Sequence, residues 1–117
     1  MFNNCCNTFQ KILPPELMEK AISLTSTGVN ELAWKWQDAI TVVEILVGNG
    51  FLVLGGDVYF YSHGKFKATR DNWCFQSAKS EGFKDAINKS RDHSVEYIKT
   101  YAQKNGENFY YSIVVRE

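Results

Sequence analysis

The sequence predicts a protein of the α+β class, with an antiparallel or mixed sheet of three to four strands packed against about three helices. Helical periodicity recurs in three stretches, strand-like alternation occurs in others, and a hairpin signal joins two of the strands. Strands and helices do not alternate regularly along the chain, which excludes a doubly wound nucleotide-binding fold.

The first two predicted helices lie in the N-terminal half. A short helix begins at Pro14–Pro15, because proline is tolerated in a first helical turn, and apolar residues at helical spacing continue it to Ile22, with Gly28 as its end. The segment 36–47 is rich in β-branched residues, which favour a strand. Its length exceeds that of a typical strand, so we expect a helix there with Gly48 as its C-cap.

The third predicted helix begins at Phe83 and ends at the sequence Lys104-Asn105-Gly106. One face of this helix consists of Phe83, Ala86, Ile87, Ser90, Ser94, Tyr97, Ile98 and Tyr101. After it, residues 109–116 alternate in the manner of a half-buried strand, with Phe109, Tyr111, Ile113 and Val115 on one side.

Two strand-like runs, 51–54 and 58–61, surround the glycine pair Gly55 and Gly56. A phosphate-binding loop needs a third glycine and a helix directly after it, so we expect the pair to form a bulge or corner of the sheet. His63-Gly64 predicts a hairpin turn, and residues 70–82 predict a loop.

The composition predicts one domain over residues 1–117, with an irregular segment over 1–14. Lys plus Arg and Asp plus Glu number 13 each and no basic run occurs, which argues against a nucleic-acid partner. No signal sequence and no membrane-length apolar run is present. Cys5, Cys6 and Cys74 predict no disulfide framework, so we expect a reducing cytoplasm.

The sequence offers no catalytic, cofactor or metal constellation. Cys74 with His63 or His93 is the one conceivable catalytic dyad, but an inert thiol and solvated imidazoles are the more frequent arrangement. Adjacent Cys5 and Cys6 lack the ligand spacing of a zinc site. We therefore expect neither enzyme activity nor a cofactor.

Two residues have both a structural and a functional interpretation. Asp57 follows the glycine bend, where a hydrogen-bonded structural carboxylate is favoured over a functional acid. Trp73 follows the turn-forming residues Asp71 and Asn72, and core cover is favoured over a role as a binding anchor.

Three stretches, GVNELAW (28–34), LGGDVYF (54–60) and DNW (71–73), together resemble the immunity protein 40 family of bacterial polymorphic toxin systems. The resemblance runs from about Ala21 to Tyr101 and leaves the first fifteen residues and the final strand, with Tyr110 and Tyr111, outside it. It implies a protein without catalytic residues that neutralises a cognate toxin domain by direct contact.

We expect the contact surface where the irregular loop meets the sheet, because polar and aromatic residues concentrate there. The expected partner-binding residues are Asp57, Tyr59, His63, Arg70, Asp71 and Trp73, and the expected structural residues are Gly55, Gly56 and Asn72. The alternative function is that of a small ligand-binding or regulatory domain with a pocket near the Gly55-Gly56-Asp57 bend.

Overall fold

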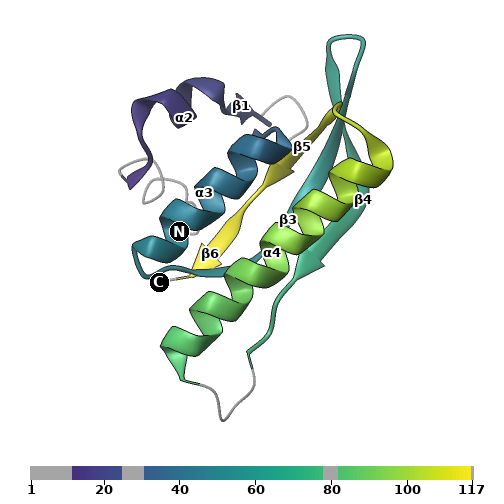
Figure 1. Ribbon diagram of the computed structural model, residues 1–117. Coiled ribbons are helices and arrows are strands. Elements are labelled where there is room, and N and C mark those ends of the chain that lie inside the picture. The colour runs from purple at the N-terminus through teal and green to yellow at the C-terminus, as the bar shows by residue number, and fades with distance from the viewer. Residues whose placement is uncertain (1–11, 25–30, 78–81, 117) are drawn as a thin grey trace.

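The computed structural model describes residues 12–24, 31–77 and 82–116. Within these ranges, helices α3 (Trp36–Gly48) and α4 (Phe83–Asn105) lie on the same face of an antiparallel sheet (Figure 1). A shorter helix, α2 (Pro15–Lys20), contacts α3. The predicted α+β class, with three helices against an antiparallel sheet, is confirmed.

The sheet has six strands in the described part of the chain, so the predicted three to four is too few. The strands are β1 (Ile22–Ser23), β2 (Leu32–Trp34), β3 (Leu52–Ser62), β4 (Lys65–Cys74), β5 (Phe109–Ser112) and β6 (Val114–Arg116). Their order is β1-β2-β5-β3-β4, and β6 also pairs with β3. Two- and three-residue strands such as β1 and β2 are too short to show a period of two, which is why the sequence did not predict them.

The central strand β3 joins the two runs that were predicted as separate strands. β6 pairs with its first half and β5 with its second half, and Gly55 and Gly56 lie where one partner replaces the other. The pairing register shifts between Val53 and Gly55 opposite β6, and Gly55 has a φ of 148°. A Cβ atom on Gly56 would overlap the Ser112 carbonyl oxygen, so this position requires glycine. The predicted bulge is confirmed.

Strand β4 continues through residues that were predicted as a loop, so that prediction is wrong up to Cys74. The turn-forming residues make a bulge within the strand instead, in which Arg70 has a φ of 73°. The Thr69 hydroxyl donates to the Val58 carbonyl oxygen at 2.9 Å and accepts from the Asp71 N–H at 3.0 Å, which compensates for the interrupted ladder. The predicted His63-Gly64 turn is confirmed, since both residues have positive φ.

The helix ends test the capping predictions. Helix α2 ends at Lys20, earlier than predicted, because Ala21 is extended and Ile22 pairs with Ala33; Gly28 lies outside the described residues. Helix α3 includes Gly48 as its last residue, one position beyond the predicted end, and Asn49 follows as the cap. Helix α4 ends as predicted before Gly106, which has a φ of 98°.

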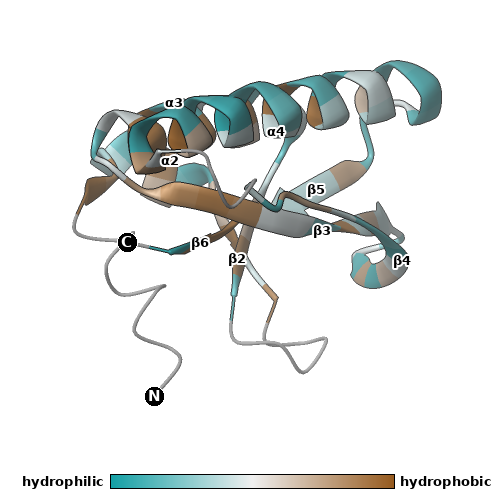
Figure 2. Ribbon diagram, turned by 90° about the horizontal axis from the view of Figure 1, so that it is seen from below, coloured by the Kyte–Doolittle hydropathy of each residue, from teal (hydrophilic) through white to brown (hydrophobic). Residues whose placement is uncertain are grey.

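The core lies between the two long helices and the sheet, and the outer sides of α3 and α4 are hydrophilic (Figure 2). Its large aromatic residues have satisfied polar groups: Trp34 Nε1 donates to the Leu17 carbonyl oxygen at 2.8 Å, and Trp73 Nε1 donates to Ser94 Oγ at 3.0 Å. Trp73 also stacks on Tyr97, with ring centroids 5.0 Å apart. Trp73 therefore fixes β4 to α4.

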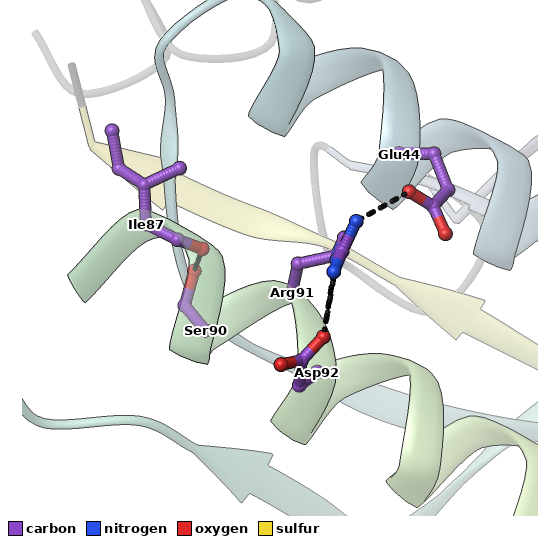
Figure 3. Close-up of polar contacts among 5 residues, drawn as sticks. All are labelled: Glu44, Ile87, Ser90, Arg91 and Asp92. Atoms are coloured by element: carbon purple, nitrogen blue, oxygen red, sulfur yellow. Dashed lines mark hydrogen bonds and ion pairs between the residues drawn. The ribbon is translucent and has the colours of Figure 1, made fainter. Parts of the chain in front are cut away.

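The neighbouring residues Ser90 and Arg91 of α4 differ in their contacts: Ser90 makes buried hydrogen bonds and Arg91 makes solvated ion pairs (Figure 3). Ser90 is buried; its hydroxyl donates to the Ile87 carbonyl oxygen at 2.8 Å and accepts from the Val53 N–H of β3 at 3.2 Å. Arg91 is more exposed and lies 3.6 Å from Glu44 of α3 and 2.9 Å from Asp92. Because these ion pairs are solvated, they add little to stability, whereas Ser90 joins the helix to the sheet interior.

Candidate partner-binding face

The face of the sheet opposite α3 and α4, which we call the second face, has its own set of side chains. Tyr59 and Tyr110 lie on it because successive residues of a strand point to opposite sides, and their neighbours Val58 and Tyr111 belong to the main core. The second face has a buried part, Leu24, Ala33, Tyr59 and Ser112, and a part that is open to solvent, made up of Glu31, Asp57, Tyr61, Phe66 and Tyr110. Any partner contact must therefore be made by the second group.

Two carboxylates, Glu31 and Asp57, form an acid pair at this face. Partial burial raises the pKa of both, and for Glu31 the charge of Asp57 raises the pKa further. Burial and the charges of Asp57 and Glu31 also raise the pKa of Tyr59 to about 12. Negative charge is thus concentrated where it is poorly solvated.

The hydrogen bonds around the acid pair leave part of it unsatisfied. The Ser112 hydroxyl accepts from the Asp57 N–H at 3.1 Å, and its bond to Glu31 lowers the pKa of that residue against the larger effect of burial. Glu31 Oε1 is buried and finds no hydrogen-bond partner among the described residues. Neither acid forms an ion pair with a described residue, so no described cation balances the charge of the pair.

The sheet is hollowed beside Asp57, with a volume of about 210 Å³. This Gly55–Gly56 hollow is lined by Leu54, Gly55, Gly56, Asp57, Asn72, Trp73 and Val114. Because two of the lining residues have no side chain, the β3 backbone itself forms part of its wall. Asp57 therefore belongs to both the acid pair and the hollow.

Aromatic side chains occupy the hairpin end of the second face. Phe66 packs against Tyr61 and Tyr110, with ring centroids 4.7 and 5.2 Å apart. Tyr61 is 37% exposed, while the other two are partly buried. Partly exposed aromatic residues beside charged ones are typical of protein-binding surfaces.

The structure does not bring all six predicted binding residues onto one surface. Asp57 and Tyr59 lie on the second face, but Tyr59 is only 4% exposed. Asp71 and Trp73 contact α4 instead: the Tyr101 hydroxyl donates to Asp71 Oδ2 at 2.7 Å, and Trp73 is 5% exposed, which confirms that Trp73 is a core residue.

The remaining two predicted binding residues, His63 and Arg70, are exposed in the turn and in the β4 bulge. The structural residues Gly55, Gly56 and Asn72 line the hollow.

The structure places Cys74, His63 and His93 on different elements and does not assemble them into a catalytic or metal site. Cys74 is an exposed thiol at the end of β4, and His63 lies in the turn before the other end of that strand. His93 lies on α4, where its ring is 6.1 Å from that of Phe75. No group of three or more potential metal ligands occurs within the described residues, and Cys5 and Cys6 lie outside them.

Glu31 is the residue that the sequence did not single out. It precedes the three-residue strand β2, and only the order β2-β5-β3 brings it near Asp57. Each of the three stretches that resemble the family contributes here: Glu31 from the first, Gly55 to Asp57 from the second and Asn72 from the third. Glu31 is half-buried and lies next to a strand of only three residues, which is too short to show a periodic pattern in the sequence.

The fold and its second face define a small α+β protein with one helix-covered sheet face and one face bearing acids and aromatic residues. The chain belongs to the immunity protein 40 family, whose sequence profile matches residues 23–115. No curated protein and no solved structure matches the chain. The match includes β5, so the expectation that Tyr110 and Tyr111 lie outside the family region is wrong.

Proposed function

We propose that the chain is a bacterial immunity protein that binds and neutralises a cognate toxin domain of a polymorphic toxin system by direct contact, without catalysis. Its family membership supports the first part of this proposal. The single observation that supports direct contact is the acid pair at the second face, with its buried and unsatisfied Glu31 oxygen. A cation of a protein partner can reach Asp57, which lines the open hollow, and offset the negative charge of the pair there.

The size of the hollow argues against the alternative of a small-ligand pocket. Pockets for small molecules usually enclose about 300–1,000 Å³, whereas the Gly55–Gly56 hollow measures about 210 Å³ and is open to one side. A space of this size suits one side chain of a protein partner.

The six predicted binding residues do not all have the same place in the proposed contact surface. Asp57 and Asn72 form its centre beside the hollow, and Tyr61 extends it towards the hairpin. His63 and Arg70 contribute at its rim, while Asp71 and Trp73 support it from the α4 side.

The proposed partner is the toxin protein, and we propose the cytoplasm as the place of action. No helix in the described ranges combines the length and apolarity that crossing a membrane requires. The equal numbers of basic and acidic residues, with no basic run, give nucleic acid no electrostatic footprint.

Co-expression with a toxin candidate encoded beside the gene tests the proposal. We expect restored growth, and co-purification of the chain with a catalytically inactive form of the toxin in a fixed ratio. Restored growth without a complex, or chemical modification of the toxin by the purified chain, would contradict neutralisation by binding. A chain that neither rescues growth nor binds would refute the proposed function as a whole.

A further inference from the structure

We propose that the Gly55–Gly56 hollow receives a lysine or arginine side chain of the toxin domain, and that Asp57 binds its charge while Glu31, behind Asp57, adds to the negative charge of the site. This inference rests on the proposed function, and it specifies the site and the chemistry of the partner. It combines three observations on the described residues: a hollow lined by the half-buried Asp57, a second half-buried acid, Glu31, that shares the partner Ser112 with Asp57, and a Glu31 oxygen without a hydrogen-bond partner.

The charge of the site requires a cation. The charge of Asp57 raises the pKa of Glu31, so the two carboxylates repel, and partial burial removes much of the water that would screen them. Within the described part of the chain no lysine or arginine forms an ion pair with either acid. A guanidinium or ammonium group from the partner would bind Asp57 in the hollow and offset the negative charge that Asp57 and Glu31 share.

The shape of the site favours a long, narrow side chain. Leu54 and Val114 provide apolar wall against which the methylene groups of lysine or arginine can pack. Asp57 and the exposed Asn72 provide oxygen acceptors for the charged end. The glycines keep the wall flat, because neither has a side chain to fill the space.

Other hollows of the described residues lack this unmet charge. One of about 280 Å³ contains Glu107, whose carboxylate accepts from Trp36 Nε1 at 3.2 Å. Another, of about 360 Å³, contains Glu44 and Asp92, which already pair with Arg91. The acid pair at the second face is therefore the better receptor for a partner cation.

The test is the affinity for the inactive toxin domain of Asp57→Asn, Glu31→Gln and the double variant. These substitutions keep the shape and remove the charge, so we expect about a thirtyfold or greater loss of affinity, as for a desolvated charge pair at an interface. Glu19→Gln, on the exposed surface of α2, is the matched control and should bind as wild type does.

Thermal unfolding of the same variants separates a binding role from a structural one. Removing half-buried acids that lack a cation should leave the melting temperature unchanged or raised. Weaker binding with an unchanged or higher melting temperature supports the inference, and weaker binding that accompanies a lower melting temperature overturns it. Wild-type affinity in the double variant also overturns it, without affecting the proposed function, which fails only if wild type does not bind.

A double-mutant cycle identifies the partner cation. Each lysine and arginine of the toxin surface is changed to alanine, and affinity is measured with wild type and with Asp57→Asn. One toxin position should weaken binding to wild type but have little further effect with Asp57→Asn. If every toxin substitution has the same effect with both proteins, no cation pairs with Asp57 and the inference is wrong.

Discussion

The two faces of the sheet use polar groups in opposite ways. On the helix-covered face, the indole N–H groups of Trp34 and Trp73 donate to a carbonyl oxygen and a serine hydroxyl, and Ser90 joins α4 to β3. On the second face, the acids Glu31 and Asp57 are partly buried without a cation from the described residues.

From this difference we infer that the helix-covered face stabilises the fold and that the second face serves binding. Satisfied polar groups inside a packed core stabilise the fold and fix its register. Acids whose pKa is raised by burial cost folding free energy while they are ionised, so their arrangement is explained better by a partner than by the fold. We expect substitutions on the covered face to lower stability, and neutral substitutions of the acids to lower binding.

The largest expected effect is at the bulge that shapes both faces. Gly56→Ala places a Cβ atom against the Ser112 carbonyl oxygen and 2.5 Å from the Trp73 ring, and backbone in a central strand cannot move away. We expect a loss of more than about 5 kcal/mol, enough to prevent folding. Circular dichroism of the purified variant would show this.

Gly48→Ala is the matched control, because nothing lies within 4 Å of its added methyl group and the residue is helical. It should raise the free energy of unfolding by about 0.5–1 kcal/mol. A normally folded Gly56→Ala variant would show that the bulge tolerates a side chain, contrary to this account.

Removing the Trp73 side chain should have the next largest effect. Trp73→Ala leaves a cavity between β4 and α4, for which we expect a loss of about 3–5 kcal/mol in urea unfolding. Ser94→Ala leaves the indole N–H buried without its acceptor and should cost about 1–3 kcal/mol. Wild-type stability of Trp73→Ala, together with weaker toxin binding, would instead make Trp73 a binding anchor.

The smallest expected changes in stability come from removing the hydroxyl groups of Tyr101 and Tyr111 on the helix-covered face. Tyr101→Phe removes a 2.7 Å bond to Asp71 and should cost about 1 kcal/mol. The Tyr111 hydroxyl is buried and has no partner among the described residues, so Tyr111→Phe should be neutral or slightly stabilising. A larger loss for Tyr111→Phe than for Tyr101→Phe in chemical unfolding would reverse this assignment.

The sequence predicted those parts of the fold that are long or have a strong turn signal. Helix α4, the His63-Gly64 turn and the alternation of 109–116 were identified because each follows a clear period or turn chemistry, although the single strand predicted over 109–116 is divided at Ile113 into β5 and β6. The second half of β4 was missed, because Asp71 and Asn72 are turn-forming residues; here Asp71 lies in a bulge and Asn72 pairs with Asp57 in the strand ladder.

The candidate site was only partly accessible to sequence reasoning. Asp57 and the glycines were recognised because they interrupt an apolar run. Glu31 was not, because its proximity to Asp57 depends on the pairing of β2, β5 and β3. Asp71 and Trp73 flank Asn72, which pairs with Asp57, but Trp73 packs against α4, as does Asp71 through its bond to Tyr101.

The most direct test of the division between the two faces is the pH dependence of the free energy of unfolding. The folded-state pKa values of Glu31 and Asp57 are raised, so the folded state binds protons more readily than the unfolded state and loses stability as pH rises through those values. Wild type should therefore lose more stability between about pH 4.5 and pH 7 than the Glu31→Gln/Asp57→Asn double variant. Equal pH dependence, with a double variant less stable than wild type at pH 7, would show that these acids support the fold and are not held for a partner.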